Sequence, residues 1–191
     1  NKKYPNMLFI KNNLIFATLT THIRLKDITK HLSSKKYIYN KIFHINKTLI
    51  NDFGIKNPKI IIAGINPHAG ENNCIGNEET IFLKPVIKKL IENNINIYGP
   101  YSGDSVLTKK NMKNYNCFIF NYHDQALIPF KMISNNTGIN YTSGLSIIRV
   151  APDHGTAYDI VGKKIGNIKG LINCVNLIKK IYKNKKKIAN S

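Results

Sequence analysis

The chain has 191 residues, enough for one sizeable hydrophobic core or for one domain and part of another. Its net charge of +19 comes almost entirely from lysines spread along the sequence, with only Arg24 and Arg149 as arginines, which argues against a nucleic-acid-binding surface. Three widely separated cysteines argue against a disulfide scaffold and are typical of a reducing cytoplasm, and no apolar run approaches the ~18 residues that a membrane span requires.

The predicted elements alternate between strands and helices. Short apolar runs at residues 14–19, 59–65, 95–98 and 117–122 are typical of buried strands. A helix is expected to begin near residues 77–79, and residues 138–149 are expected to be extended. The last element, residues 168–182, is predicted to be a helix that packs on the sheet through Ile168, Leu171, Ile172, Val175, Ile178 and Tyr182. This alternation predicts an α/β sandwich with a largely parallel or mixed sheet.

A polar cluster with a histidine follows three of these strands directly. The histidines are His22, His68 and His123. Ligands of open α/β sheets bind beyond the carboxyl ends of strands, and three imidazoles leave an open coordination position on a divalent ion. The three side chains are therefore candidate metal ligands, and the alternative for each is an ordinary loop or surface histidine.

Five further side chains are candidates for catalysis or for binding an anionic substrate. Asp104 follows a Gly-Pro turn and Asp124 follows His123, so either carboxylate could orient a ligand or act as a base, with a turn or helix cap as the alternative. Lys131, Asn140 and Arg149 could bind an anion, and an arginine in a chain that otherwise uses lysine suggests a need for its planar fork. The alternative for Arg149 is a surface ion pair.

A glycine-containing loop after residue 152 is a candidate cofactor-binding segment. Its backbone N–H groups could contact a phosphate or ribose, although many turns share this composition. The residues concerned are His154, Gly155, Thr156, Ala157 and Asp159. Neither a GxGxxG nor a GxxxxGK[ST] motif is present, so neither a Rossmann nor a P-loop site is indicated.

Taken together, these motifs resemble the 4-hydroxythreonine-4-phosphate dehydrogenase family. Their order and spacing match the family along nearly the whole chain. The matching segments are Thr20-Thr21-His22, Asn66-Pro67-His68-Ala69-Gly70, Gly99-Pro100 with Asp104, His123-Asp124-Gln125, Gly138-Ile139-Asn140, Gly144-Leu145 with Arg149, and Asp153-His154-Gly155-Thr156-Ala157.

The resemblance implies a fold like that of isocitrate and isopropylmalate dehydrogenases. It implies that residues 1–142 form most of a metal-binding, substrate-binding and dimerisation domain, and that residues 143–191 form the C-terminal part of a cofactor-binding domain. It also implies a cytoplasmic homodimer in which ligands from both subunits hold one Zn, Mg, Mn or Co ion. His22, His68 and His123 match the metal ligands.

The implied reaction belongs to vitamin B6 (pyridoxal 5'-phosphate) biosynthesis. NAD or NADP would oxidise 4-phosphooxy-L-threonine, a phosphorylated amino acid, to 2-amino-3-oxo-4-phosphooxybutanoate, which loses carbon dioxide to give 3-amino-2-oxopropyl phosphate. Lys131, Asn140 and Arg149 match substrate-binding positions, Asp104 and Asp124 match acidic positions beside the metal, and residues 154–157 match a cofactor loop.

The sequence departs from the family at its start. The family carries an N-terminal segment with a substrate-contacting His-Thr pair, which is absent here, so we expect either part of a longer chain or a degraded gene product, with apolar sheet surface exposed. Three alternatives stay open: a related metal-dependent hydroxy-acid dehydrogenase of the same fold, a non-catalytic dimerising remnant, and a basic nucleic-acid-binding domain, which the even spread of lysines disfavours.

Overall fold

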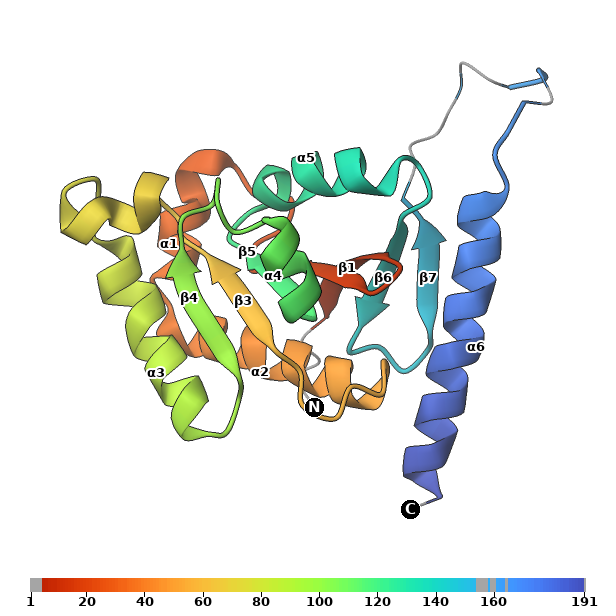
Figure 1. Ribbon diagram of the computed structural model, residues 1–191, viewed down its shortest axis with the longest axis horizontal. Helices are drawn as coiled ribbons and strands as arrows, with labels where there is room; N and C mark the ends of the chain where they lie inside the picture. The colour runs from red at the N-terminus through yellow and green to blue at the C-terminus, as the bar shows by residue number, and fades with distance from the viewer. Residues whose placement is uncertain (1–4, 154–157, 159–160, 164, 191) are drawn as a thin grey trace.

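Seven strands form one sheet at the centre of the molecule (Figure 1). The computed structural model describes residues 5–153, 158, 161–163 and 165–190. The strands are β1 (Asn6–Lys11), β2 (Leu14–Thr18), β3 (Ile60–Ala63), β4 (Ile97–Tyr101), β5 (Cys117–Phe120), β6 (Ile139–Ser143) and β7 (Arg149–Pro152), in the order β4-β3-β5-β2-β1-β6-β7. The neighbours β4, β3, β5 and β2 are parallel, whereas β1, β6 and β7 pair antiparallel. The predicted α/β fold with a mixed sheet is confirmed.

Helices cover both faces of the sheet, which makes the predicted sandwich. On one face lie α1 (Ile28–Leu32), α2 (Lys35–Asn51), α3 (Lys84–Glu92) and α6 (Lys169–Ala189), and on the other lie α4 (Lys109–Asn114) and α5 (His123–Ser134). Three short turns complete the set: η1 (Leu25–Asp27), η2 (Pro67–Asn73) and η3 (Glu79–Leu83).

Side chains alternate between the two cores because successive residues of a strand point to opposite faces. In β2, Ile15 and Ala17 join the core under α2, whereas Phe16 joins the core under α5. Local signals fix the helix ends: the Ser34 hydroxyl accepts the Tyr37 N–H at the start of α2, and Asn135 ends α5 in a left-handed conformation.

Two predicted strand bounds were wrong. β4 spans Ile97–Tyr101 rather than residues 95–98, because the strand continues through the Gly-Pro pair that was expected to end it. The stretch 138–149 is not one extended segment: β6 ends at Ser143, the chain turns, and β7 begins at Arg149 and pairs antiparallel with β6.

The predicted packing face of the last helix was also wrong. Its expected residues, Ile168, Leu171, Ile172, Val175, Ile178 and Tyr182, are 38% to 67% exposed. The buried residues of α6 are instead Gly170, Cys174, Leu177 and Ile181, which lie on nearly the opposite side of the helix. The helix is apolar on two sides, so the hydrophobic period alone could not show which side packs on the sheet.

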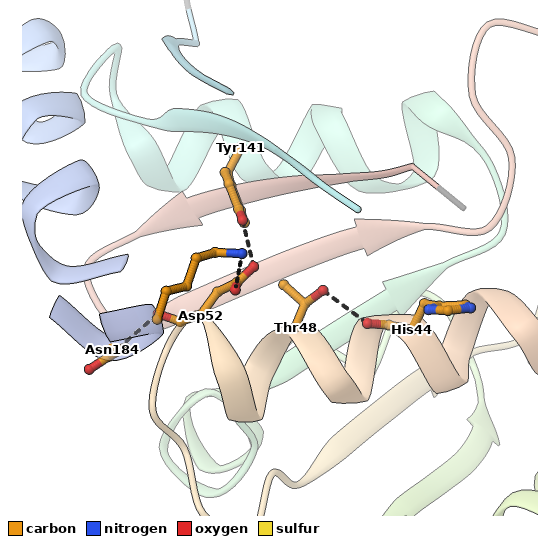
Figure 2. A network of polar contacts seen from close by, with 6 residues as sticks. His44, Thr48, Asp52, Tyr141 and Asn184 are labelled. Atoms are coloured by element: carbon orange, nitrogen blue, oxygen red, sulfur yellow. Dashed lines mark hydrogen bonds and ion pairs between the residues drawn. The ribbon is translucent and has the colours of Figure 1, made fainter. Parts of the chain in front are cut away.

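A buried carboxylate ties α6 to the rest of the fold (Figure 2). The Tyr141 hydroxyl of β6 donates to Asp52 Oδ2 at 2.5 Å, and Lys185 Nζ of α6 lies 3.0 Å from Asp52 Oδ1. Asn184 Nδ2 donates to the Asp52 carbonyl oxygen at 2.9 Å. Burial and the hydrogen bond to Asp52 raise the pKa of the Tyr141 hydroxyl. Asp52, which follows α2, thereby joins three elements that are distant in sequence.

The predicted domain boundary between residues 142 and 143 falls at the end of β6, and β7 continues the same sheet beyond it. The division into two domains stays a prediction. Within the described residues, no helix is both long enough and apolar enough to cross a membrane.

Candidate active site

The four parallel strands end at one edge of the sheet, and the predicted site residues follow them. In the order of the strands β4, β3, β5 and β2, the residues after the strand ends are Asp104, His68, His123 and His22. Because parallel strands have their carboxyl ends on the same edge, this order makes His22 and His123 neighbours and places His68 between His123 and Asp104.

His22 and His123 face each other across the ends of β2 and β5. Their ring centroids are 5.5 Å apart. The pairing of these strands continues past their ends, since the Thr20 N–H and the Thr20 hydroxyl both donate to the Asn121 carbonyl oxygen, at 3.1 Å and 2.7 Å. His22 has a φ of 51°, a left-handed conformation that is unusual for a non-glycine residue. The prediction that strand ends bring histidines together is therefore met for this pair.

The two histidines line one cavity of about 310 Å³. Its lining residues are Thr20, His22, Ile23, Leu25, Ile28, Tyr122, His123 and Asp124. His123 begins α5, and its Nδ1 lies 2.7 Å from Oδ1 of Asp124, which is exposed in the first turn of the helix. A carboxylate at this position interacts favourably with the helix dipole and can orient the imidazole.

A buried amide fixes the end of β5 against the end of β3. Asn121 Nδ2 donates to the carbonyl oxygens of Ala63 and Gly64, at 3.0 Å and 2.8 Å. Gln125 Nε2 also donates to the Gly64 carbonyl, at 2.9 Å, while Gln125 Oε1 accepts the Asn121 N–H at 2.8 Å. These bonds hold the loop that precedes His68 beside the one that precedes His123.

His68 lies in a left-handed turn. It is exposed, with φ of 52°, and the following residues of η2 also have positive φ. The hydrogen bond from Ser102, at 2.5 Å, lowers the pKa of the Asp104 carboxyl below its ordinary value, and positive charge on His68 lowers it further.

The side chains at this edge are of types that bind divalent metal ions, and the fold brings two of the three histidines, His22 and His123, close together. His22 and His123 offer two imidazoles, with Asp124 beside them, and imidazole suits borderline divalent ions. Among the described residues of this single chain, no three His, Cys, Asp or Glu side chains gather closely enough to hold one ion. The third ligand, and sharing of the site between subunits, stay predictions.

The predicted substrate-binding residues lie on the side of the sheet that α5 covers. Asn140 pairs with Phe9, a member of the core under α5, so it points to that face. Asn140 Oδ1 is buried and accepts no hydrogen bond within the part of the chain that the structure describes. Lys131 is exposed on α5, seven residues after Asp124 and hence on the same side of the helix.

Arg149 begins β7 at the same sheet edge as the histidines. β6 runs parallel to β2, because both pair antiparallel with β1, and Arg149 pairs with Thr142 near the carboxyl end of β6. Its Nη1 donates to the Thr142 hydroxyl at 2.8 Å, which leaves the other guanidinium nitrogens exposed for an anion. Two strands, β1 and β6, lie between β7 and β2, so Arg149 is on the order of 14 Å from β2 at the usual spacing between strands.

The five predicted cofactor residues, His154, Gly155, Thr156, Ala157 and Asp159, lie outside the described residues. Two positions of the site were missed from the sequence. Asn121 and Glu79 are buried polar residues that bind the backbone of the strand-end loops. A signal for Asn121 existed, since it interrupts an apolar run just before His123, whereas Glu79 was read only as part of a helix start.

Comparisons with known proteins agree with this architecture. The family described as "Pyridoxal phosphate biosynthetic protein PdxA" matches residues 1–178. A 4-hydroxythreonine-4-phosphate dehydrogenase of Sulfurihydrogenibium is 42% identical over 176 residues, which are 92% of this chain and 53% of that protein. A putative D-threonate 4-phosphate dehydrogenase of Bradyrhizobium diazoefficiens is 31% identical over 186 residues, covering 92% and 53%.

Solved structures lead to the same group. The crystal structure of a 4-hydroxythreonine-4-phosphate dehydrogenase from Klebsiella pneumoniae superposes with a TM-score of 0.80 at 31% identity, covering 93% of this chain and 53% of that one. The chain thus spans about half the length of the curated relatives it matches.

Proposed function

The chain belongs to the PdxA family of pyridoxal phosphate biosynthetic proteins, and on that premise we propose that it acts as a metal-dependent dehydrogenase of 4-phosphooxy-L-threonine. The product, 2-amino-3-oxo-4-phosphooxybutanoate, is a β-keto acid and loses carbon dioxide to give 3-amino-2-oxopropyl phosphate. The proposal includes NAD or NADP as oxidant, one Zn, Mg, Mn or Co ion, a cytoplasmic location and a homodimer with the metal site at the subunit interface.

The observation that carries the proposal is the common sheet edge. Two imidazoles with ring centroids 5.5 Å apart, two acidic residues and an arginine lie along the edge formed by the carboxyl ends of the parallel strands and the start of β7. Parallel sheets place ligand sites at this edge. A phosphorylated hydroxy amino acid needs positive charge for its phosphate and carboxylate, and a metal with a nearby base for its hydroxyl.

Different residues of the chain bind the substrate, accept its proton and orient the metal ligands. Arg149 and Lys131 bind the two anionic ends of the substrate, and the buried Asn140 Oδ1 accepts a hydrogen bond from it. Asp124, beside His123, takes the proton of the reacting hydroxyl, while Asp104 orients His68. A divalent ion held by His22, His68 and His123 would supply the polarisation of this hydroxyl, and a bound nicotinamide would supply the hydride acceptor.

The test is substrate binding and turnover by the purified chain. With 4-phosphooxy-L-threonine, a divalent ion and NAD, we expect reduced nicotinamide to form, and calorimetry to detect substrate binding. Arg149→Lys should weaken binding by roughly tenfold or more, because lysine cannot offer a planar fork. Lys110→Ala, at an exposed lysine of α4, is the control and should bind as the wild type does. If the purified chain showed no turnover and no substrate binding at saturating metal, that result would contradict the proposal.

One relative favours a second candidate substrate. The Bradyrhizobium protein, which is 31% identical to this chain, is named for D-threonate 4-phosphate. That molecule carries a carboxylate at one end and a phosphate at the other. The same cationic residues suit both molecules, which differ in the amino group. Competition between the two substrates in the same assay separates them: the proposed function requires preference for the amino acid.

A further inference from the structure

The turn that carries His68 has a strained backbone. From His68 to Asn73, six consecutive residues have φ values of 52°, 53°, 85°, 41°, 56° and 73°. Only Gly70 among them lacks a Cβ, so the others have a conformation that L-residues rarely adopt in succession. Such a turn persists only where its surroundings hold it in place.

The carboxylate of Glu79 makes the contacts that hold it. Glu79 is 1% exposed. Its Oε1 accepts the backbone N–H groups of Ile65 and Asn66, both at 2.7 Å, and its Oε2 accepts Asn66 Nδ2 at 3.0 Å. These residues connect β3 to the turn, so the carboxylate fixes the point from which the turn starts.

The turn is also packed against the same carboxylate. A Cβ added to Gly70 would lie 2.9 Å from Glu79 Oε2 and 2.8 Å from the Gly76 carbonyl oxygen. A Cβ on Gly64 would lie 3.2 Å from Glu79 Oε1 and 2.8 Å from Ala69 Cα. The two glycines therefore allow the chain to close around Glu79, at Gly64 before the turn and at Gly70 within it.

Within the described part of the chain, no ion pair is found at this buried carboxylate. The ion pairs found among the described residues do not include Glu79, although the chain has 29 basic residues. The carboxylate accepts three N–H donors from described residues, an arrangement that suits an acceptor for backbone groups rather than a salt bridge. The residue also begins η3, a single turn of π-helix, a geometry frequent at functional sites.

We propose that Glu79 is a positioning residue that clamps the left-handed turn and thereby sets where His68 presents its imidazole. The proposal rests on the proposed function in one respect, that His68 serves as a metal ligand. Glu79 itself contacts no substrate or metal: it acts through the backbone of Ile65 and Asn66. Its substitution should therefore change metal affinity and the conformation of the turn together.

Three variants separate position from charge. Glu79→Gln keeps the length and the Oε1 acceptor for the two backbone N–H groups but loses the charge and the bond from Asn66 Nδ2. Glu79→Asp keeps the charge but shortens the side chain by one methylene, so it cannot reach both backbone N–H groups. Glu79→Ala removes both. The matched control is Glu78→Gln, because Glu78 is a neighbouring carboxylate whose Oε2 accepts from Asn66 Nδ2 at 2.7 Å without contacting the backbone of the turn.

The first measurement uses the metal-free chain. Amide hydrogen exchange at Ile65 and Asn66, and the 13Cα chemical shifts of residues 68–73, report on the clamp directly. We expect exchange to accelerate at least about tenfold and the shifts to move in Glu79→Asp and Glu79→Ala, with smaller changes in Glu79→Gln and none in Glu78→Gln. Unchanged exchange and shifts in both Glu79→Asp and Glu79→Ala would overturn the proposal.

The second measurement is titration with Co²⁺, whose visible absorption reports its ligands. Loss of a group that orients a metal ligand costs roughly 10- to 100-fold in affinity, so we expect that loss in Glu79→Asp and Glu79→Ala and less than tenfold in Glu79→Gln. Wild-type affinity in Glu79→Asp together with a large loss in Glu79→Gln would show that charge rather than position matters, and would overturn the proposal. If wild type bound no Co²⁺, the metal site of the proposed function would fail, and the exchange measurement alone would decide the role of Glu79.

Discussion

The parallel and antiparallel halves of the sheet differ in how completely this chain covers them. In the parallel half, every residue of β3 and of β5 is buried between two helical layers, and the strand ends carry the histidines. In the antiparallel half, Arg149 of β7 is exposed and the rest of the strand is half-buried, and α6 leaves an apolar side in solvent. Among the described residues, β3 and β5 lie wholly inside the core, and a closed core can keep the side chains at their strand ends in fixed positions.

The largest expected effect comes from opening the core of the parallel half. Phe118 is fully buried, and its ring centroid lies 5.5 Å from that of Phe16. Phe118→Ala should lower the free energy of unfolding by about 3–5 kcal/mol, from lost burial and the cavity left behind. Tyr182→Ala, on the exposed side of α6, should change it by less than about 0.5 kcal/mol. Urea denaturation measures both, and similar losses would contradict the contrast between the halves.

The next largest loss of stability is expected at the hydrogen bond between Tyr141 and Asp52, which joins β6 to the end of α2. Tyr141→Phe removes the hydroxyl that donates to the buried Asp52 carboxylate. An unsatisfied buried acceptor costs about 1–3 kcal/mol, so the variant should be less stable by that amount. Tyr182→Phe, at an exposed tyrosine, is the control. Equal stability of Tyr141→Phe and wild type would show that the network of Figure 2 does not secure α6 to the sheet.

A smaller effect depends on pH. Burial lowers the pKa of Lys41 on α2 to about 8, and its Nζ donates to the Pro5 carbonyl at 3.2 Å. Between about 8 and 10.5 the unfolded chain therefore holds a proton that the folded chain releases, so this group makes stability rise with pH in that window and is least favourable below it.

The comparison of two variants tests this sign. From about pH 8 to about pH 9.5, the free energy of unfolding of wild type should rise by roughly 1–2 kcal/mol more than that of Lys41→Met. Lys36→Met, at an exposed lysine of the same helix, should follow the wild-type profile. A wild-type profile that coincides with that of Lys41→Met would contradict the prediction.

The smallest effect on stability is expected on the outer side of α6. Leu171→Asn with Val175→Asn should change the free energy of unfolding by less than about 0.5 kcal/mol per site, since both residues face solvent. The same pair should clearly reduce the fluorescence of a dye that binds apolar surface. A destabilisation of several kcal/mol would mean that this side of α6 packs against the protein after all.

Strand positions could be predicted from the sequence because a buried strand leaves a local signal. The runs that became β2, β3 and β5 are apolar apart from Thr18 at the end of β2, and the polar residues after them indicated the sheet edge. The proximity of His22 and His123 followed from parallel pairing. These inferences need only neighbours in sequence and a general rule about sheets.

The failures have a common physical cause, because each depends on contacts made in three dimensions. A Gly-Pro pair is typical of a strand end, yet Gly99 and Pro100 lie within β4, which pairs with β3 on both sides of them, at Tyr98 and Tyr101. Helix α6 has two apolar stripes, and which of them packs on the sheet depends on tertiary contacts that the sequence pattern does not show. Glu79 could not be identified because its acceptors bind a backbone thirteen residues away, and no local pattern encodes that bond.

The most direct test of the central claim, that strand-end histidines form a divalent metal site, is elemental analysis of the purified protein. Wild type should contain a near-stoichiometric divalent ion, and His123→Ala and His68→Ala should each lose it, whereas His31→Ala, away from the strand ends, should retain it. A metal-free wild type, or an ion retained in both His123→Ala and His68→Ala, would contradict the claim and favour a non-catalytic, dimerising chain.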